Sequence, residues 1–482
     1  MEHDKPTDSW PAPADITASI AGWMLSARWH QGEEGTLRAE GCLDVTNWAR
    51  HCDGGQEAET ARVIWMVIGD GRAEYNVPLV VSRSAGEQEL SGSPEGPGAV
   101  AAMGDYLIYD ATEHPLGQRT LLALLASGET GDATPPSTQP NGSGDSGPLP
   151  MEQLRVLGQA VHGPLGRVSS ARKLTSEQSN TSVIYRFDDH PPVILKIFRV
   201  LAPGHNPDVE LQQALDVTGT VPRQYGSVRM EWKSDGEKRG ADVVVAAEFL
   251  EGAHDAWQVI TERLSASDGT LGYMEDSIRS LGVLTREVHN ELSRDFPTVE
   301  ATPQRRATLR QSWSTRARTA MELVPDVEAY EGSIETIYSA TEHVDWPRLQ
   351  RIHGDYHLGQ VLESPGRGWY ALDFEGEPLR PLEERTREDL ALRDVAGMLR
   401  SFDYAAGAAQ LAGGDEARVQ AWATAAKKAF LDGYGELGDE ETILLEALVL
   451  DKALYEVVYE ATERPDWLAI PLAGISRLAS AG

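Results

Sequence analysis

The sequence is poor in cysteine, in positive charge and in long apolar segments, and each shortage excludes a class of protein. Its 482 residues include only Cys42 and Cys52, too few for a disulfide framework or a cysteine metal site. Lys and Arg number 43 against 75 Asp and Glu, and the net charge of −32 would repel nucleic acid and anionic membranes. No apolar run approaches the roughly 20 residues that span a bilayer. The first residues, Met1-Glu-His-Asp-Lys5, show no basic-then-apolar signal pattern, so we expect a cytoplasmic protein.

The chain is long enough for two or three compact units and has an ordinary globular composition, with 41% hydrophobic and 24% charged residues. Strand-like alternation dominates up to about residue 250, and helical spacing of apolar residues dominates after it. The stretch 128–149 is dense in Gly, Pro, Ser, Thr and Asp, so we predict a disordered loop there. A β-rich half followed by a helical half predicts an α+β protein with two lobes.

The most informative segment is His353-Gly-Asp355, which is followed by Gln360 and then by an apolar stretch ending at Asp373-Phe-Glu375. Phosphotransferases of the protein-kinase type write this order of parts as H-R-D-x-x-x-x-N and then D-F-G. A short H-x-D pair alone arises by chance in many chains. The amide and the strand-end carboxylate at kinase-like offsets favour the functional interpretation, in which the catalytic loop joins the β-rich and helical halves.

The chemistry of phosphoryl transfer assigns a role to each of these groups. Asp355 would receive the proton of an acceptor hydroxyl. Gln360 and Asp373 would hold Mg²⁺, with Glu375 as a further ligand, because this hard cation prefers oxygen donors. His353 would brace the catalytic loop by hydrogen bonding rather than act as a base. His357 remains open between a structural role and contact with substrate.

The strand-rich half offers groups for the nucleotide. Lys196 lies in the apolar run Val193–Phe198, and we expect it to bind phosphate, although a lone strand lysine more often points to solvent. Such a lysine needs a carboxylate partner, and Glu210, at the start of a helical run, is the candidate. The backbone of Glu248 and Leu250, where the two halves join, would pair with a purine edge.

A polar segment stands where a kinase carries its glycine-rich loop, yet it contains no glycine. Its amides and hydroxyls could donate hydrogen bonds to phosphate oxygens. An ordinary polar turn is the alternative. The donors in question are Gln178, Ser179, Asn180, Thr181 and Ser182.

Near the C-terminus, a helical stretch carries aromatic rings beside charged groups at offsets of three and four residues. Aromatic faces next to carboxylates suit a carbohydrate, whose C–H faces stack while its hydroxyls donate. An amphipathic helix whose tyrosines only pack in the core is the alternative. The candidate residues are Lys452, Tyr455, Glu456, Tyr459, Glu460 and, in the loop that follows, Trp467.

Together, these motifs resemble those of actinobacterial maltokinases from about residue 150 onward. The segments that carry the resemblance are Glu177–Ser182, His353–Leu362, Asp373–Pro378, Leu392–Tyr404 and Asp451–Pro471. The resemblance implies an aminoglycoside-phosphotransferase-like fold with an N-terminal cap subdomain (1–90), an intermediate subdomain (91–248) and a helical C-lobe with the sugar pocket (249–482).

For function, the resemblance implies ATP- and Mg²⁺-dependent phosphorylation of maltose to maltose 1-phosphate, which feeds α-glucan synthesis from trehalose. It carries the phosphotransfer roles given above onto Asp355, Gln360, Asp373, Lys196 and Glu210. We expect a monomer that associates with a trehalose synthase.

Three alternatives remain open. The acceptor could be glucosamine or another sugar, or an aminoglycoside, because related kinases share the catalytic loop. The chain could also be a pseudokinase, although its catalytic residues are present. The chain departs from the family in its cap motif. Arg28 and Trp29 are kept, but Glu33 stands where the family carries a lysine.

Overall fold

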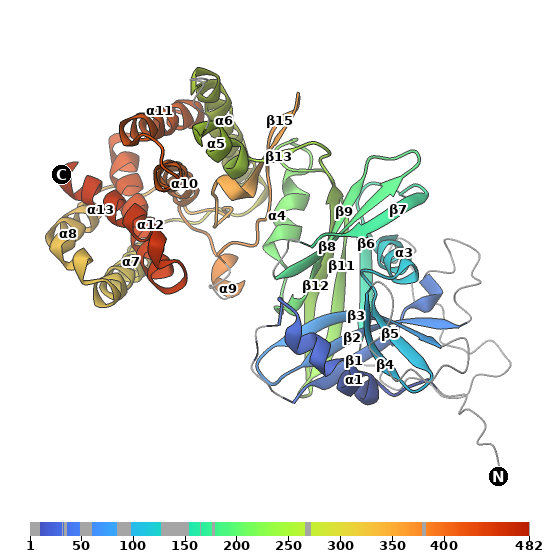
Figure 1. Cartoon of the computed structure of the whole chain (residues 1–482). Coiled ribbons are helices and arrows are strands. Elements are labelled where there is room, and N and C mark those ends of the chain that lie inside the picture. The colour runs from blue at the N-terminus through green and yellow to red at the C-terminus, as the bar shows by residue number, and fades with distance from the viewer. Residues whose placement is uncertain are drawn as a thin grey trace, which may run out of the picture. The chain divides into compact units, whose positions relative to one another are not determined.

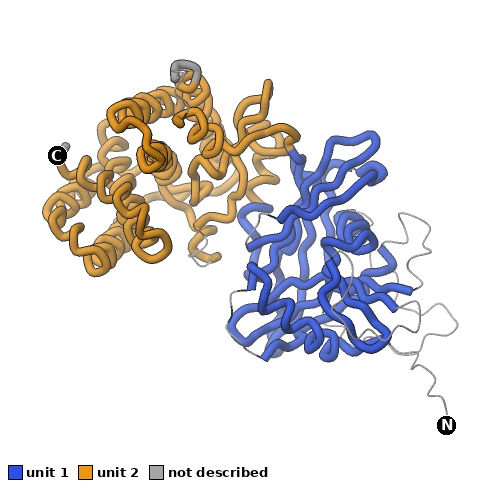
Figure 2. The backbone as a smooth tube through the Cα atoms, in the orientation of Figure 1, with its two compact units in different colours: residues 1–209, 223–249 blue, residues 210–222, 250–482 orange. Residues whose placement is uncertain are grey.

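The structure of the chain, a computed structural model, describes most of the sequence. The described residues are 10–30, 32, 36–48, 60–83, 98–126, 154–163, 165–175, 179–265, 271–377 and 382–481. They divide into two compact units (Figure 2): unit 1 comprises 1–209 and 223–249, and unit 2 comprises 210–222 and 250–482. The predicted loop at 128–149 lies outside the described residues.

Unit 1 contains two antiparallel six-stranded sheets (Figure 1). The first has the order β1-β2-β3-β5-β4, with β10 paired to the beginning of β3. Its strands are β1 (Arg38–Asp44), β2 (Ala61–Gly69), β3 (Glu74–Arg83), β4 (Ala99–Met103), β5 (Tyr106–Asp110) and β10 (Val200–Leu201). Since β4 and β5 belong to this sheet, residue 90, the predicted end of the cap, falls between two of its strands. The division of the first 248 residues into a cap and an intermediate subdomain stays a prediction.

The second sheet of unit 1 has the order β6-β11-β12-β9-β8-β7. Its strands are β6 (Arg155–Ala160), β7 (Val168–Lys173), β8 (Asn180–Phe187), β9 (Val193–Phe198), β11 (Gln224–Ser234) and β12 (Glu237–Glu248). The helices of the unit are α1 (Pro13–Ser26) and α3 (Pro115–Ala123), which continues into η2 (Leu124–Ala126). The long hairpin β11–β12 turns at Asp235 and Gly236, whose positive φ values of 49° and 81° are those of a type I′ turn.

Strand β2 shows how this half of the chain builds its core. Its run of apolar residues is buried on both faces, and alternate side chains go to different clusters because a strand has a period of two. Val63, Trp65 and Val67 join a cluster with the second sheet. Ile64, Met66 and Ile68 pack with the apolar stripe of α1 on the other face. The first sheet is therefore covered on both sides.

Unit 2 is mainly helical and includes the small sheet β13-β14-β15. Helix α4 (Pro207–Leu215) belongs to unit 1 up to Val209 and to unit 2 from Glu210. The other elements are β13 (His254–Asp255), α5 (Ala256–Ser265), α6 (Leu271–Asp295), α7 (Pro303–Leu323), η3 (Pro325–Tyr330), α8 (Glu331–Ala340), η4 (Leu358–Gln360), β14 (Val361–Ser364), β15 (Gly368–Ala371), α9 (Leu382–Arg385), α10 (Leu392–Leu411), α11 (Glu416–Tyr434), α12 (Asp439–Glu463), η5 (Pro465–Trp467) and α13 (Ala469–Ala481).

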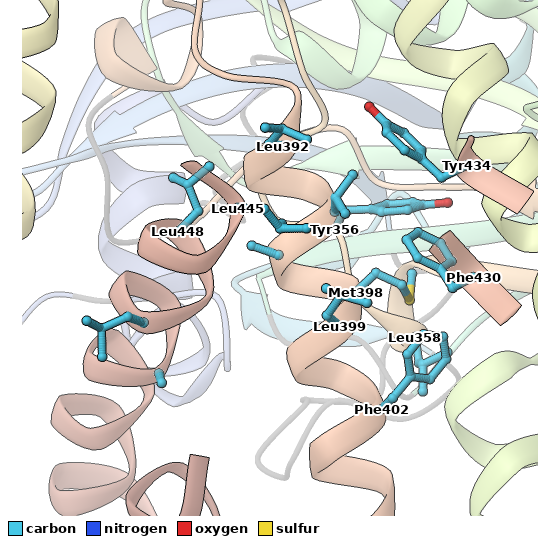
Figure 3. Packing of buried hydrophobic residues seen from close by; sticks show 14 of the residues in the cluster. Tyr356, Leu358, Leu392, Met398, Leu399, Phe402, Phe430, Tyr434, Leu445 and Leu448 are labelled. Atoms are coloured by element: carbon cyan, nitrogen blue, oxygen red, sulfur yellow. The ribbon is translucent and has the colours of Figure 1, made fainter. Parts of the chain in front are cut away.

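Helix α10 is the central element of unit 2. Of its 20 residues, 15 are buried, which is the pattern of a helix surrounded by others. Helices α5, α11, α12 and α13 contact it. Figure 3 shows apolar side chains of α10 packed with Tyr356 and Leu358, which come from the predicted catalytic loop. The loop is therefore anchored on the hydrophobic core of the unit.

The structure confirms the predicted α+β class, with a strand-rich unit followed along the chain by a helical one. Within the half predicted to be strand-rich, the apolar run Val193–Phe198 is strand β9, which pairs with β8. Among the residues that the structure describes, no helix is both long enough and apolar enough to cross a bilayer.

Candidate active site

The residues predicted to carry phosphoryl transfer lie in both units, and each half of the site is described by itself. Unit 2 contains the catalytic loop around Asp355 and the candidate metal ligands. Unit 1 contains Lys196 and the polar segment at the start of β8.

The catalytic loop is held by a buried carboxylate at the start of α10. Asp394 Oδ2 accepts the backbone N–H of His353 at 2.8 Å, and Oδ1 accepts that of Gly354 at 2.9 Å. These two donors immediately precede Asp355, so one side chain fixes the backbone from which the proposed base projects.

Two further residues of the same helix receive the next part of the loop. A Cβ atom on Gly397 would lie 2.5 Å from the carbonyl oxygen of Tyr356, so only glycine permits this approach. Ser401 Oγ accepts the N–H of Leu358 at 3.0 Å. Positions 394, 397 and 401 lie on one helix face because they are three and four residues apart. This face of α10 is the floor of the catalytic loop.

Asp394 is itself fixed by a buried histidine. His289 Nε2 lies 3.0 Å from Asp394 Oδ2, and His289 Nδ1 lies 3.0 Å from the hydroxyl of Tyr434. Burial by itself would raise the pKa of Asp394, but hydrogen bonds from His289 and from the backbone of Gly354 hold it below its ordinary value. A proton on Nε2 donated to Asp394, with Nδ1 accepting from the hydroxyl of Tyr434, satisfies both contacts. Beneath the loop there is therefore a buried, hydrogen-bonded anion.

His353 connects two parts of the site. Its Nε2 donates to the carbonyl of Leu372 at 2.8 Å, and its Nδ1 accepts the N–H of Asp355 at 3.4 Å. The ring also packs against Phe374, with 4.6 Å between centroids. Both ring nitrogens are thus engaged in holding loops together, which fits the bracing role expected for this residue better than that of a base.

The structure brings two of the three candidate Mg²⁺ ligands into direct contact. Strands β14 and β15 pair Val361 with Ala371, so the residues at the ends of this hairpin meet. Gln360 Nε2 donates to Asp373 Oδ2 at 3.2 Å. Asp373 has a φ of 61°, a left-handed conformation that is uncommon outside glycine and is often found at functional sites. An amide oxygen and a carboxylate are donors that suit Mg²⁺.

The third candidate ligand, Glu375, follows two residues later. Its backbone carbonyl accepts from Arg385 Nη1 at 2.8 Å. Its role as a metal ligand stays a prediction.

Lys452, expected to contact the sugar, lies at the proposed base. Its Nζ is 3.3 Å from Asp355 Oδ1 and 3.0 Å from Glu377 Oε1. Burial opposes the charge of Lys452, but Glu377 and Asp355 raise its pKa well above the ordinary value, so the ammonium is charged. His357 lies on the other side of Asp355, with 4.0 Å between Nε2 and Oδ2, and burial lowers its pKa. Sequence reasoning missed Glu377.

The two carboxylates expected in the sugar pocket are engaged by protein groups. Glu456 is 8% exposed and accepts from Arg400 Nη2 at 2.7 Å. Glu460 is 1% exposed and accepts from Arg464 and from the hydroxyl of Tyr404. Helix α12 turns these residues toward the core, where α10 supplies Arg400 and Tyr404. Both carboxylates thus have protein partners, and their place in a sugar pocket stays a prediction.

The aromatic candidates lie beside cationic groups. Lys452 Nζ lies 4.8 Å from the centroid of the Tyr455 ring, and the guanidinium of Arg464 lies 5.3 Å from that of Tyr459. Trp467 stacks near Tyr404, with 6.3 Å between ring centroids. Their contact with a sugar stays a prediction.

In unit 1, the carboxylate at Lys196 is not the expected one. Lys196 Nζ donates to Asp208 Oδ2 at 3.1 Å, while Glu210 accepts from Arg351 Nη1 at 2.7 Å in unit 2. Helix positions that differ by two residues lie about 200° apart around the axis, so Asp208 and Glu210 face nearly opposite directions. Lys196 does pair with a carboxylate of α4, as predicted, but the carboxylate is that of Asp208 and not that of Glu210.

The polar segment at the start of β8 is partly used inside the unit. Thr181 is 4% exposed, and its Oγ1 accepts from Arg199 Nε at 2.9 Å. Ser182 is buried opposite Lys196 in the β8–β9 register. Neighbouring residues of a strand point to opposite faces of the sheet, so these two hydroxyls lie on opposite faces, and their contact with phosphate stays a prediction. Ser179 and Asn180 precede them, and Gln178 lies outside the described residues.

The proposed purine-binding backbone lies at the boundary of the units. The N–H of Glu248 donates to the carbonyl of Arg223 at 2.8 Å in unit 1. The carbonyl of Leu250 accepts the N–H of Ala253 at 3.2 Å in unit 2. The N–H of Glu248 and the carbonyl of Leu250 thus already have backbone partners, and contact of this segment with a purine stays a prediction.

Several positioning residues escaped the sequence analysis. Asp394, Gly397 and Ser401 are spaced by three and then four residues within Leu392–Tyr404, so they lie on one face of the helix. Non-apolar residues at this spacing in an otherwise apolar helix could have indicated them. His289 gave no signal, because a single histidine on a helix is usually a core residue.

Known proteins show which fold this is. No protein-family model matches the chain. A glucosamine kinase of Streptacidiphilus jiangxiensis is 28% identical over 334 residues, which cover 63% of this chain and 72% of the relative. A glucosamine kinase of Mycolicibacterium smegmatis is 28% identical over 330 residues, or 64% of this chain and 80% of the relative.

A solved structure of a glucosamine kinase in complex with glucosamine, ADP and inorganic phosphate aligns with a TM-score of 0.64. The alignment covers 97% of this chain and 99% of that one at 20% identity. A second crystal form aligns with a TM-score of 0.61. The chain therefore has the two-part kinase fold of these proteins, which confirms the predicted fold. The similarity does not single out the maltokinases that the motifs resemble.

Proposed function

We propose that this chain is an ATP-dependent sugar kinase whose acceptor is an amino sugar of the glucosamine class. The sugar-kinase part is supported by both sequence relatives and by the shared fold. The narrower assignment replaces the maltose acceptor implied by the motifs. Glucosamine was the alternative within that same analysis, and the relatives favour it.

The observation that carries the proposal is the construction around Asp355. Its loop is fixed by the buried Asp394 and ends at the contact between Gln360 and Asp373. A buried anion that accepts two backbone N–H groups is a costly way to hold a loop unless the position of the loop matters. The arrangement supplies a fixed carboxylate for the acceptor and fixed oxygen ligands for a cation.

In the proposed reaction, Asp355 orients the acceptor hydroxyl and takes its proton as the oxygen attacks the γ-phosphorus of ATP, whose bond to the β–γ bridging oxygen breaks to release ADP. Gln360 and Asp373 would hold Mg²⁺, and the Lys196–Asp208 pair would hold a phosphate of ATP. When bound, Mg·ATP supplies the phosphoryl group and neutralises its charge. His353 keeps the loop of Asp355 tied to the segment that carries Asp373.

Carboxylates at the proposed base fit an acceptor that carries an amine. Asp355 and Glu377 lie beside Lys452, and the charge of the buried Arg393 also acts on Glu377. A protonated amine is attracted to carboxylates at short range, whereas maltose offers no positive charge to them. The proposal of a cationic acceptor relies on these two carboxylates rather than on Glu456 and Glu460.

A panel of acceptors with purified protein tests the proposal. Glucosamine, maltose, glucose and an aminoglycoside are each supplied with Mg·ATP, and ADP is measured by a coupled assay. We expect the highest kcat/KM with glucosamine. Turnover of maltose but not glucosamine would return the assignment to maltokinase, and turnover of neither would reject both acceptors.

The assignment of the base has its own control. Asp355→Asn should lower kcat by about 10²- to 10⁴-fold, because general-base catalysis contributes that much. The fold should be retained, as judged by circular dichroism. If this variant kept full activity, Asp355 would not be the base.

A further inference from the structure

Unit 1 contains a cavity of about 570 Å³ whose wall is built mostly from residues without a role in the proposed reaction. Three segments line it: the end of α1 with the three residues that follow, the stretch from the end of β5 into α3, and β7 with the two residues after it and the beginning of β8. A volume of this size accommodates a small ligand such as a monosaccharide or disaccharide.

The carboxylates on the wall are already neutralised. Glu113 accepts from Lys173 Nζ at 2.7 Å. Asp110 accepts from Arg199 Nη2 through both oxygens, at 2.8 and 3.0 Å. Burial alone would raise the pKa of Asp110, but Arg199 and Lys173 hold it below the ordinary value. Neither acid is left to compensate another cation on the wall.

Two arginines on the same wall have no such partner among the residues that the structure describes. Within the part of the chain that the structure describes, the side chains of Arg28 and Arg172 make no hydrogen bond, ion pair or ring contact. The chain has 75 acidic and 43 basic residues, so most arginines can find a carboxylate. Two guanidinium groups on one cavity wall that no described residue compensates therefore give the described part of this cavity a local positive charge against the acidic background.

The wall is also fixed from behind. Arg199 is fully buried, donates to Thr181 and Asp110, and lies 5.4 Å from the ring centroid of Trp29. All three of these partners line the cavity. The Nη1 atom of Arg199 is buried without an acceptor among the described residues. A wall that is held rigid and carries N–H donors without acceptors among the described residues is the arrangement expected of a preorganised anion site.

We propose that this cavity binds a small phosphorylated sugar. Guanidinium groups recognise phosphate through paired N–H donors, which suits Arg28 and Arg172. The partly exposed ring of Trp23 also lines the cavity and offers a face on which a sugar ring stacks. Strand β8, part of the wall, pairs with β9, which carries Lys196, so the ligand would contact the sheet that holds the proposed ATP-binding lysine.

Isothermal titration calorimetry without nucleotide tests the site. The probes are glucosamine 6-phosphate, glucosamine and inorganic phosphate. The choice of an amino-sugar phosphate rests on the proposed function, but binding is measured without turnover, so the two can fail separately. We expect glucosamine 6-phosphate to bind more tightly than inorganic phosphate.

The double variant Arg28→Ala/Arg172→Ala should weaken the binding of glucosamine 6-phosphate at least ~tenfold, because two charged hydrogen-bond donors are lost. Arg167→Ala, an exposed arginine directly before β7 that is not part of the wall, should bind as the wild type does. Both wall arginines are exposed, so the variant should keep its melting temperature, and Arg28→Gln and Arg172→Gln singly provide milder replacements. Equal affinity of the wild type and the double variant would overturn the proposal. Equal affinity for phosphate and glucosamine 6-phosphate would overturn its sugar part.

Discussion

Replacing Gly397 by alanine tests the positioning of the catalytic loop without removing any group that takes part in chemistry. The added Cβ would lie 2.5 Å from the carbonyl oxygen of Tyr356, the residue directly after Asp355. Carbon and oxygen normally approach no closer than about 3.3 Å. The loop must therefore move by roughly 0.8 Å relative to α10, or the helix must move away from it.

This displacement has a different effect on stability than on activity. Alanine is favoured over glycine inside a helix by about 1 kcal/mol, and overpacking costs about 1 to 3 kcal/mol, so the net loss of stability stays below about 2 kcal/mol. A misplacement of about 1 Å at a catalytic group costs on the order of 100-fold in rate. We expect kcat to fall by 10- to 100-fold while the protein remains folded.

The assay compares Gly397→Ala with Gly332→Ala, a matched change in helix α8. A Cβ on Gly332 meets nothing within 4 Å, so this variant should keep wild-type kcat. Steady-state kinetics with glucosamine and urea unfolding are measured for both. A Gly397→Ala enzyme with kcat within twofold of the wild type would refute the idea that contact with α10 sets the position of Asp355.

Further predictions concern the buried charges. Lys452→Met should destabilise the fold by about 1 to 3 kcal/mol, since the buried Glu377 then loses one of its cationic neighbours while Arg393 remains, and adding Glu377→Gln should recover part of this in urea unfolding. Failure of the double variant to recover would place the effect elsewhere. The pKa of Asp394 is lowered in the folded state, so its contribution to stability is present above about pH 4 and is lost as the pH falls through the folded pKa. Below about pH 4, wild-type stability should therefore fall more steeply than that of Asp394→Asn, and parallel curves would contradict this. Asp208→Asn should raise the KM for ATP several-fold, whereas Glu210→Gln should not, and the reverse result would restore the pairing expected from the sequence.

Parts of the site that depend on short chain segments could be predicted from the sequence. The order His353-Gly-Asp355, then Gln360, then Asp373 predicted a catalytic loop followed by an apolar segment that ends in a carboxylate, and the structure shows that Gln360 and Asp373 touch. The strand carrying Lys196 followed from its alternating apolar neighbours, because burial of a strand has a period of two residues. The strand-rich and helical halves followed from the same periodicities.

Contacts between distant segments needed the tertiary structure. Lys196 pairs with Asp208 rather than Glu210 because the rotation of α4 decides which carboxylate faces the strand. Glu456 lies against Arg400 because α12 packs on α10, and no spacing within either helix predicts that packing.

By itself, the sequence determined the two-part α+β class and the order of the phosphotransfer groups, since both arise from local periodicity and from residues near one another in the chain. Only the tertiary structure decided which partner each charge takes, because Asp394 meets the catalytic loop, and Lys452 meets Asp355, across 40 to 97 residues of intervening chain. Over such separations, the direction in which each helix turns its side chains decides the contact.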